Sequence, residues 1–387
     1  MKQANSTLSA LGTTIFEVMS RLSEVHGAVN LGQGFPDEGF PIDVLEVAAE
    51  QTLKGWNQYP STMGVPELRQ AVANHGQRFY GLDVDWQREV LVTSGATEAL
   101  AATMLGLLEP GDEVVVFQPL YDCYLPMIRR GGATPKFVNL HLPDWSLDPE
   151  ELRAAFSPRT KLVLLNNPLN PAAKVWTAAE LQLVADLVQE FDCYAVGDEV
   201  YEHLVFDGRR HLPLLGIDGL RDRAVKIGSA GKTFSLTGWK IGYVTASPAL
   251  LTPIAKAHQF LVYTTPPNLQ HAVAFGLSKD QTYFDGLTNL MTTRRNTLAA
   301  GLSGLGFDVL DSAGTYFLNI NITGLPRAEL GDAAFCEWLV REVGVAAIPG
   351  SAFYDQEPLR NVVRFCFCKK QSTIDEALRR LSNAFAS

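Results

Sequence analysis

Cysteine and positive charge are both scarce in this chain of 387 residues, and no long hydrophobic run is present. The five cysteines are an odd number and lie inside apolar stretches, which indicates reduced, buried thiols and a cytoplasmic protein. The net charge of −10 disfavours a nucleic acid or an anionic membrane as a partner. No apolar run approaches the roughly 18 residues of a membrane span, and the N-terminal residues lack the apolar core of a signal peptide.

Two short motifs give only weak indications of a ligand. Cys366 and Cys368 alternate within an apolar segment, but no histidine or further cysteine stands at zinc-ligand spacing beside them. Gly32 and Gly34 lack the third glycine, the preceding strand and the following helix of a dinucleotide-binding fingerprint. We therefore expect neither a metal site nor a dinucleotide site at these positions.

The pattern of apolar and amphipathic segments predicts an α/β fold. Strands rich in Val, Ile and Leu without alternation are typical of a parallel sheet that is buried on both faces. Seven such segments predict a mostly parallel, seven-stranded sheet: 89–93, 113–117, 134–138, 162–165, 194–196, 224–227 and 241–246. Helices are expected to flank this sheet at 67–80, 98–108, 121–130 and 178–190.

The chain is expected to form two units. Residues 46–285 predict the large domain, and residues 286–387 predict a small α+β domain with a long helix at 283–305, a further helix at 328–343 and a strand at 362–368. The first 45 residues are irregular and rich in Gly and Pro, so we expect them to pack on the small domain.

Lys232 lies among small, turn-forming residues, which holds its amine close to the backbone. Desolvation lowers the pKa of a lysine and makes its amine nucleophilic enough to form a Schiff base with a carbonyl. Ser229 and Lys240 flank it as an anion donor and a second cation, which suits a phosphorylated aldehyde such as pyridoxal phosphate. A lone lysine in such a loop is more often an ordinary surface residue, so the interpretation depends on the neighbouring motifs.

A second segment predicts a phosphate site. An apolar strand runs through Ser94 and Gly95 into a helix that starts near Ala96 and Thr97. The free N–H groups and the positive dipole at such a helix start favour a phosphate. Capped turns of this kind are common and usually bind nothing, so this signal is weak by itself.

Two further segments offer partners for a pyridine ring. Asp198 closes an apolar strand, where a carboxylate holds a ring nitrogen protonated, and Tyr201 follows three residues later as a donor to a ring hydroxyl. Asn170 lies in a doubled Asn/Pro turn that fixes it as a donor for a phenolate oxygen. The alternatives are a capping pair for a following helix at Asp198 and a bare turn at Asn170.

Arg364 stands in the apolar segment 361–368, where a guanidinium is costly unless an anion meets it. Its planar, two-pronged geometry suits the α-carboxylate of an amino acid. An internal salt bridge to Asp or Glu is an equally good alternative at this point.

In this order the motifs resemble the fold-type-I pyridoxal-phosphate aminotransferases of classes I and II, over essentially the whole chain. The resemblance is greatest to the branch of kynurenine aminotransferases, glutamine transaminase K and bacterial methionine aminotransferase. The motifs that carry it are Leu31-Gly-Gln-Gly34-Phe-Pro-Asp37, Asn57-Gln-Tyr59, Tyr121-Asp-Cys-Tyr124, Asp198-Glu-Val-Tyr201, Gly228-Ser229-Ala-Gly-Lys232-Thr-Phe, Gly238-Trp-Lys240 and Arg364-Phe-Cys-Phe.

The resemblance implies a role for each of these residues toward pyridoxal 5′-phosphate. Lys232 carries the cofactor and moves the proton of Cα, and Asp198 pairs with the ring nitrogen. The remaining implied contacts are Asn170 and Tyr201 on the ring oxygen, Tyr121 stacked on the ring, and Gly95, Ala96, Thr97, Ser229 and Lys240 around the phosphate.

The resemblance also implies a homodimer with shared active sites, in which Tyr59 reaches the phosphate of the neighbouring subunit. Arg364, with Gly34 and Asn170, is implied to bind the substrate carboxylate. The chain departs from many relatives at Ala172 and Ala173, where the second position is often Gly, and at Lys240, where the wider class often has Arg.

The pocket for the substrate side chain is expected to be aromatic: Phe16, Tyr59, Tyr121, Tyr263 and Phe353, of which one or two are core packing. Thioethers contact aromatic edges favourably, so methionine is the preferred donor, with aromatic amino acids and glutamine next. Phe16 stands where kynurenine-handling relatives tend to have Trp, which weakens the case for kynurenine. A kynurenine or glutamine transaminase and a C–S β-lyase on the same fold stay open as alternatives.

Overall fold

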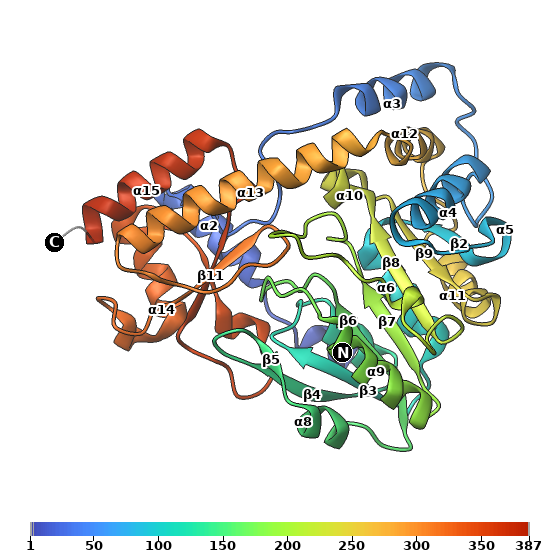
Figure 1. Ribbon diagram of the computed structural model, residues 1–387, viewed down its shortest axis with the longest axis horizontal. Coiled ribbons are helices and arrows are strands. Elements are labelled where there is room, and N and C mark those ends of the chain that lie inside the picture. Colours follow the sequence, from blue (N-terminus) through green and yellow to red (C-terminus); the bar gives the residue numbers. More distant parts are fainter. Residues whose placement is uncertain (1, 3, 386–387) are drawn as a thin grey trace.

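The structure is a computed structural model that describes residue 2 and residues 4–385, so the outermost residues of the predicted terminal segments, 1, 3, 386 and 387, lie outside it. A large sheet with its helices forms one part, and a smaller sheet with the C-terminal helices forms the other (Figure 1). Helix α13 (Gln281–Gly304) runs from one part to the other. Within the described residues, no helix is both long and apolar enough to cross a bilayer.

The large sheet has eight strands in the order β2-β9-β8-β7-β6-β3-β4-β5. Their bounds are Val90–Thr93 (β2), Glu113–Gln118 (β3), Thr134–His141 (β4), Ser146–Leu147 (β5), Thr160–Asn166 (β6), Tyr194–Asp198 (β7), Ala224–Ser229 (β8) and Gly242–Ala246 (β9). Strand β9 is antiparallel to both neighbours, and the pairs from β8 to β4 are parallel. The seven predicted strands are confirmed; β5 adds a two-residue antiparallel edge that is too short for a sequence pattern to indicate.

Helices cover both faces of this sheet (Figure 1). Their bounds are Ile42–Lys54 (α3), Pro66–Tyr80 (α4), Trp86–Glu89 (α5), Gly95–Leu107 (α6), Tyr124–Arg130 (α7), Pro149–Ala154 (α8), Ala178–Glu190 (α9), Ala230–Thr233 (α10), Pro248–Leu261 (α11) and Pro267–Leu277 (α12). Successive strand residues face opposite layers: Val115 packs in the core with α9, and Val114 packs in the core with α6 and α11. This double burial explains the absence of alternation in the strands.

The small part is built on an antiparallel sheet in the order β10-β11-β14-β13. Its elements after α13 are Asp308–Val309 (β10), Phe317–Asn321 (β11), Gly331–Trp338 (α14), Val345–Ala346 (β12), Ile348–Pro349 (β13), Val362–Cys366 (β14) and Gln371–Phe385 (α15). The single helix predicted over 328–343 is wrong in detail, because a 3₁₀ turn precedes α14 and a π-helical turn (Leu339–Val343) follows it.

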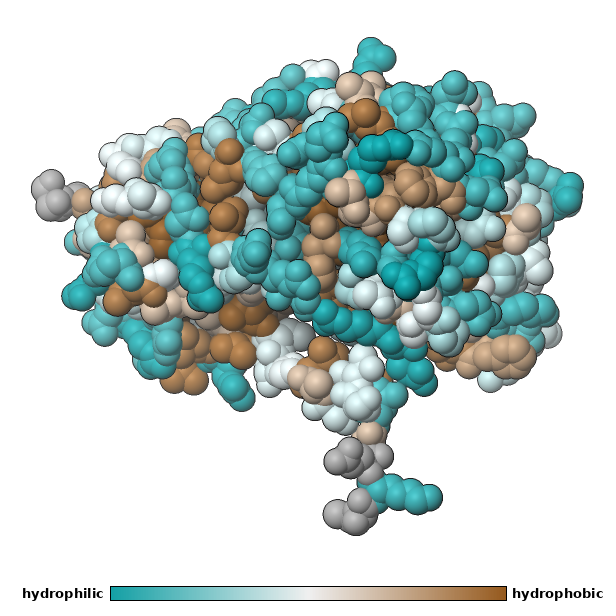
Figure 2. All heavy atoms as spheres, turned by 90° about the horizontal axis from the view of Figure 1, so that it is seen from below, coloured by the Kyte–Doolittle hydropathy of each residue, from teal (hydrophilic) through white to brown (hydrophobic). Residues whose placement is uncertain are grey.

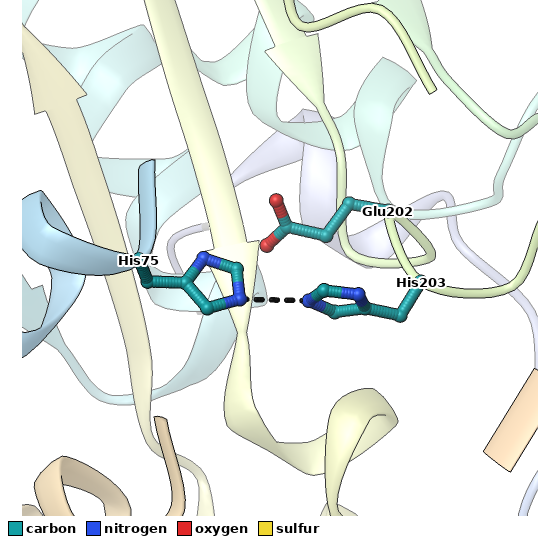
Figure 3. A group of neighbouring side chains, drawn as sticks. All are labelled: His75, Glu202 and His203. Atoms are coloured by element: carbon teal, nitrogen blue, oxygen red, sulfur yellow. Dashed lines mark hydrogen bonds between the residues drawn. The ribbon is translucent and has the colours of Figure 1, made fainter. Parts of the chain in front are cut away.

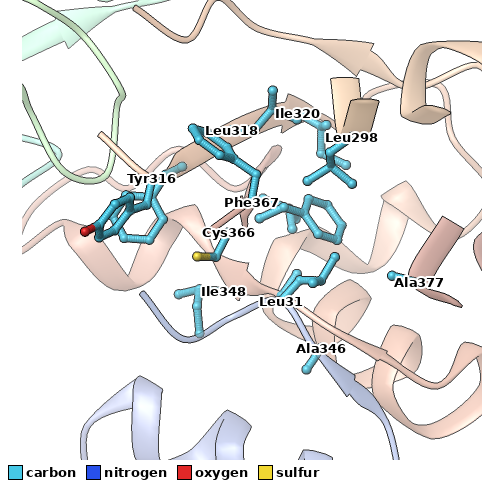
Figure 4. Close-up of a cluster of buried hydrophobic side chains, with 14 of the residues drawn as sticks. Leu31, Leu298, Tyr316, Leu318, Ile320, Ala346, Ile348, Cys366, Phe367 and Ala377 are labelled. Atoms are coloured by element: carbon cyan, nitrogen blue, oxygen red, sulfur yellow. The ribbon is translucent and has the colours of Figure 1, made fainter. Parts of the chain in front are cut away.

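The N-terminal segment contacts this small part through α2 (Ile15–His26) and β1 (Val29–Asn30), whereas α1 (Ser6–Ser9) contacts α7 of the large part. Strand β1 pairs in parallel with β12. Leu31 follows β1 and is fully buried among Leu298, Ile348 and Phe367 (Figure 4). The burial of Leu31 brings Gly32 to Arg364 of β14 and Gly34 to Phe317 of β11.

Candidate active site

A cavity of about 380 Å³ opens at the carboxyl ends of β6, β7 and β8. The last residues of these strands, Asn166, Asp198 and Ser229, all line it. This is the edge at which open parallel sheets bind ligands. Thirteen of the sixteen predicted site residues line the cavity: Phe16, Gly34, Gly95, Ala96, Thr97, Tyr121, Asn170, Asp198, Tyr201, Ser229, Lys232, Lys240 and Arg364.

Lys232 lies in the short helix α10, directly after β8. Ser229 caps this turn, since its Oγ accepts from the N–H of Gly231 at 3.2 Å. The Lys232 Nζ donates to the carbonyl of Gly34 at 3.3 Å and lies 5.4 Å from the centre of the Tyr201 ring. Burial lowers the pKa of Lys232, with the nearby anionic groups opposing the shift. The amine is therefore held in an environment that favours its neutral, nucleophilic form.

Asp198 is buried at the end of β7 and meets a hydroxyl. Tyr124 Oη donates to its Oδ2 at 2.7 Å. Burial raises the pKa of Asp198 to about 6, and the hydrogen bond from Tyr124 opposes that shift. No helix begins at residues 199–203, which form turns, so the capping interpretation of Asp198 is not observed. The carboxylate is thus available to a positively charged group in the cavity.

The start of α6 and the loop before β9 form a compact concave surface. Gly95 has φ 76°, a left-handed conformation that favours glycine. A Cβ at Gly242 would lie 2.6 Å from the carbonyl carbon of Gly95, so a larger residue there would displace the helix start. A Cβ on Gly95 would lie 3.1 Å from Lys240 Cε, which places this cation across the N-terminus of α6. Helix N–H groups, the lysine and nearby Ser229 together suit a phosphate.

Arg364 is almost fully buried in β14, with an exposed fraction of 1%. Its Nη1 donates to Asn170 Oδ1 at 2.6 Å, and its Nη2 donates to the carbonyl of Gly32 at 3.0 Å. Its Nε is buried and has no partner among the described residues. No described carboxylate forms an ion pair with it, so the salt-bridge interpretation is not observed.

Aromatic rings surround this guanidinium. The centroids of Phe317, Phe353 and Phe16 lie 3.8, 4.8 and 5.3 Å from Arg364 Cζ. Burial lowers the pKa of Arg364 to about 10. A buried positive charge without a counter-ion favours an anionic ligand, because the ligand removes the cost of leaving the charge unpaired.

The Asn/Pro turn fixes Asn170 between the two parts. Its backbone N–H donates to Asn166 Oδ1 at 2.7 Å, while its side-chain Oδ1 accepts from Arg364. The amide nitrogen is then the group that Asn170 presents as a donor. Ala173 in the same loop has φ 59°, the left-handed region, so this alanine adopts the conformation that a glycine favours.

Three predicted site residues do not line the cavity. Tyr59 and Tyr263 lie outside it and pack on each other with ring centroids 5.3 Å apart; their exposed fractions are 80% and 45%. Tyr263 therefore does not line the cavity of its own chain, and its place in a substrate pocket stays a prediction. Phe353 is buried behind the cavity, between Phe16 and Arg364, which is the core-packing alternative.

Nine lining residues had no predicted role, and three of these, Tyr124, Asn166 and Phe317, contact predicted site residues. Tyr124 ends the motif Tyr121-Asp-Cys-Tyr124. Its contact with Asp198 joins α7 to β7, and no sequence pattern in either segment predicts this contact. Asn166 is a polar residue at the carboxyl end of a buried strand, and this position could have indicated that it lines a ligand site. Phe317 packs under Arg364, a contact that no local pattern indicates.

Residues 27–381 match the family model described as "Aminotransferase class I and II". The chain belongs to this family. It is 44% identical over 389 residues to the probable N-succinyldiaminopimelate aminotransferase of Mycobacterium tuberculosis, with 97% of each chain covered. It is 39% identical over 376 residues to the methionine aminotransferase of Escherichia coli, again with 97% of each covered.

Solved structures of aminotransferases share the fold. The N-succinyldiaminopimelate aminotransferase of Mycobacterium tuberculosis has a TM-score of 0.95 at 45% identity, with 98% of this chain and 100% of that chain covered. An Escherichia coli protein whose structure identified a methionine aminotransferase function has a TM-score of 0.95 at 39% identity, with 99% and 100% covered. These findings confirm the resemblance, the enzyme class and the fold.

Class I and II aminotransferases depend on pyridoxal 5′-phosphate, so this cofactor belongs to the chain. The residues present fit it. The glycine-lined start of α6 leaves room for a phosphate, the desolvated Lys232 amine is positioned for an aldehyde, and the buried Asp198 carboxylate suits a protonated ring nitrogen. When bound, the cofactor supplies an aldehyde carbon and an electron-accepting ring. The substrates are an amino acid and a 2-oxo acid.

Proposed function

We propose that this aminotransferase transfers the amino group of methionine, or of an aromatic amino acid, to a 2-oxo acid. The lining of the cavity carries the proposal. Phe16, Phe35 and Tyr121 supply aromatic surface. The cations that line the cavity are Lys232, Lys240 and Arg364. We propose that these three bind the cofactor and the substrate α-carboxylate. Among the described lining residues, no further cation is present to bind a second substrate carboxylate. An uncharged side chain with a polarizable thioether suits such a surface.

The proposed roles follow from the geometry of the cavity. Arg364 binds the α-carboxylate through its two-pronged guanidinium, with the Asn170 amide as a further donor and the Gly34 backbone close by. Lys232 carries the cofactor; once displaced by the amino acid, its neutral amine accepts the proton from Cα and later returns one.

Asp198 pairs with the ring nitrogen, and Tyr124 holds that carboxylate in position. In the same proposal Asn170 and Tyr201 bind the ring oxygen, and Tyr121 stacks on the ring. Gly95, Ala96, Thr97, Ser229 and Lys240 surround the phosphate.

The proposal includes a homodimer with shared sites. Large hydrophobic side chains are exposed at the end of α3, in the loop that follows and at the end of α11: Leu53, Trp56, Tyr59, Phe260 and Tyr263. Figure 2 shows one face of the molecule, where hydrophobic residues are scattered among hydrophilic ones. The rings of Tyr59 and Tyr263 contact each other within this exposed set, and exposed hydrophobic patches mark interaction surfaces. Tyr59 and Tyr263 on such a surface are suited to complete the site of a second subunit.

We also propose the division of the chain into a segment 1–45, a large domain 46–285 and a small domain 286–387, and a cytoplasmic location. Support for the location comes from the cysteines, which form no disulfide among the described residues.

The first test is the visible spectrum of the holoenzyme before and after excess L-methionine, without a 2-oxo acid. We expect the band of the lysine-bound cofactor to bleach and to return when a 2-oxo acid is added. A band that methionine leaves unchanged would contradict the proposed donor. Ammonia and a 2-oxo acid formed from a cysteine thioether without any acceptor would indicate the β-lyase alternative.

N-succinyldiaminopimelate is a second candidate donor, favoured by the 44% identity over 97% of the chain to a probable N-succinyldiaminopimelate aminotransferase. A kynurenine donor is a third, since kynurenine–oxoglutarate transaminase 1 of Mus musculus is 37% identical over 395 residues. Measuring kcat/KM for the three donors with one common 2-oxo acid decides among them. We expect methionine to give the highest value, and a higher value for either other donor would replace it.

A further inference from the structure

A second group of titratable side chains lies behind the turn that carries Tyr201. It consists of His75 on α4 and of Glu202 and His203, which follow β7 (Figure 3). The two rings meet at their edges, with their planes at 82° and their Nε2 atoms 2.7 Å apart, and the Glu202 carboxylate points toward His75. One ligand atom of each residue lies within 4.8 Å of the other two. None of the three lines the active-site cavity.

The imidazoles of His75 and His203 both direct their Nε2 atoms toward the space between the two rings. The distance of 2.7 Å between the two Nε2 atoms requires that at least one ring is neutral, because a hydrogen bond needs an acceptor. A neutral ring carries one proton, and when both rings are neutral with that proton on Nδ1, the two Nε2 lone pairs point at each other. A cation between them removes that repulsion. With one proton on Nε2, a hydrogen bond between the rings is the alternative.

Two carboxylates and two cations surround the cluster. Glu202 Oε2 pairs with Lys226 at 2.8 Å, and Lys226 also lies 3.8 Å from Glu199. Arg78 also acts on His75, so Lys226 and Arg78 balance the two carboxylates, and Glu202 supplies the anionic ligand of the group. Glu202 Oε1 accepts a long hydrogen bond from Tyr243 Oη at 3.5 Å, and the Tyr80 side chain also interacts with this carboxylate. A carboxylate oxygen has lone pairs for a further partner beside such contacts.

We propose that His75, His203 and Glu202 bind one divalent ion of the borderline class, such as Zn²⁺, Ni²⁺ or Co²⁺. Two imidazole nitrogens and one carboxylate oxygen are a donor set of this class, with a fourth position left for water. Imidazole nitrogens stand about 2.0–2.1 Å from such an ion, so the two Nε2 atoms need to separate to roughly 3.3 Å. A small rotation of each side chain is enough for this separation.

The site would connect three elements close to the catalytic residues. His75 belongs to α4, and Glu202 follows Tyr201 directly. The carbonyl of His203 accepts from Thr288 on α13 at 2.9 Å, and the ring of Phe284 on the same helix lies 4.4 Å from the His203 ring. The bound ion therefore holds α4 and α13 against the turn that follows Asp198, and it acts on stability rather than on the reacting atoms.

The test uses the holoenzyme, treated with a chelator and dialysed, with Co²⁺ alone as the probe. We expect one Co²⁺ per chain by equilibrium dialysis, with visible d–d bands. His75→Gln and His203→Gln should each weaken binding by roughly tenfold or more, since each removes a ligand. His141→Gln is the matched control, because His141 is exposed and pairs with Glu151 without a second histidine. It should leave binding unchanged.

A second measurement covers variants that fold poorly. Zn²⁺ in excess over its Kd should raise the Tm of the unsubstituted holoenzyme by roughly a few degrees, and this rise should be absent in both histidine variants. The visible band of the cofactor reports whether each variant is folded. Absence of stoichiometric Co²⁺ binding overturns the proposal. Equal binding by His75→Gln, His203→Gln and the unsubstituted enzyme also overturns it, because the ion then binds elsewhere.

Discussion

Tyr124 Oη donates a hydrogen bond of 2.7 Å to Oδ2 of Asp198, and both side chains are buried. The bond joins the start of α7 to the end of β7, and it opposes the burial that raises the pKa of the carboxyl to about 6. The charge state of Asp198 therefore depends on a residue from a neighbouring element as much as on its own strand.

The first prediction concerns this hydroxyl. Tyr124→Phe removes a donor to a buried carboxylate, so the pKa of Asp198 should rise and the affinity of the apoenzyme for the cofactor should fall about tenfold at pH 7. The loss should be greater at pH 6, where more of Asp198 is protonated. Fluorescence titration of the apoenzyme at several pH values measures both effects.

Tyr354→Phe is the control for that experiment. The hydroxyl of Tyr354 is buried and has no partner within the described residues, so its removal should not weaken cofactor binding. Equal affinities of Tyr124→Phe and the unsubstituted apoenzyme across the pH range would contradict the role given to Tyr124.

A second prediction concerns the stability of the apoenzyme. The folded-state pKa of Asp198, about 6, is above the ordinary value of 3.8, so the folded chain keeps this proton to higher pH than the unfolded chain does. Stability from this group is therefore complete below about pH 4 and is lost as pH rises toward 6. Asp198→Asn removes the titration, and its free energy of unfolding should fall less than that of the unsubstituted apoenzyme over this range. Denaturant unfolding between pH 4 and 7 measures the difference; parallel pH profiles would contradict it.

A third prediction concerns Arg364. Lysine carries a point charge and lacks the two-pronged geometry, so Arg364→Lys should raise KM for the amino donor and lower kcat/KM by roughly 10- to 100-fold. The visible band of the holoenzyme should persist, because the proposed role of Arg364 concerns the substrate. Steady-state kinetics with varied donor measure the change.

The matched control is Arg295→Lys. Arg295 is also buried, but its guanidinium already binds Asp207 with two hydrogen bonds. This substitution should lower Tm and leave KM unchanged. A KM for the donor that is the same in Arg364→Lys and in the unsubstituted enzyme would contradict the carboxylate-binding role.

Much of the fold and of the site could be predicted because the information is local. The strands that end in Asn166, Asp198 and Ser229 are buried on both faces, and this burial gives unbroken apolar runs. The turns after them expose the small and polar residues that bind ligands. The position of Lys232 and Asp198 at one cavity could be predicted for this reason.

The remaining features depend on contacts between distant segments. Nothing near Tyr124 indicates that it meets Asp198, and nothing near Arg364 indicates that Asn170 is its partner rather than a carboxylate. Tyr263 follows the apolar end of α11, and its sequence does not distinguish a pocket from a surface. Strand β5, with two residues, is too short to carry a pattern.

The last prediction tests whether Tyr59 serves a neighbouring subunit. It lies outside the cavity of its own chain, so Lys232→Ala and Tyr59→Ala should complement each other in mixed dimers. The site built around the intact Lys232 then receives Tyr59 from the Lys232→Ala chain and has both residues. Random pairing makes half of the dimers mixed with one intact site each, so co-expression should give about one quarter of the unsubstituted activity. Lys232→Ala with Asp198→Asn is the control: both residues line one cavity, so no mixed dimer has an intact site. If each chain used its own Tyr59, every site in a mixed dimer would lack either Lys232 or Tyr59. Mixed dimers that have only the residual activity of Tyr59→Ala would therefore contradict the shared site.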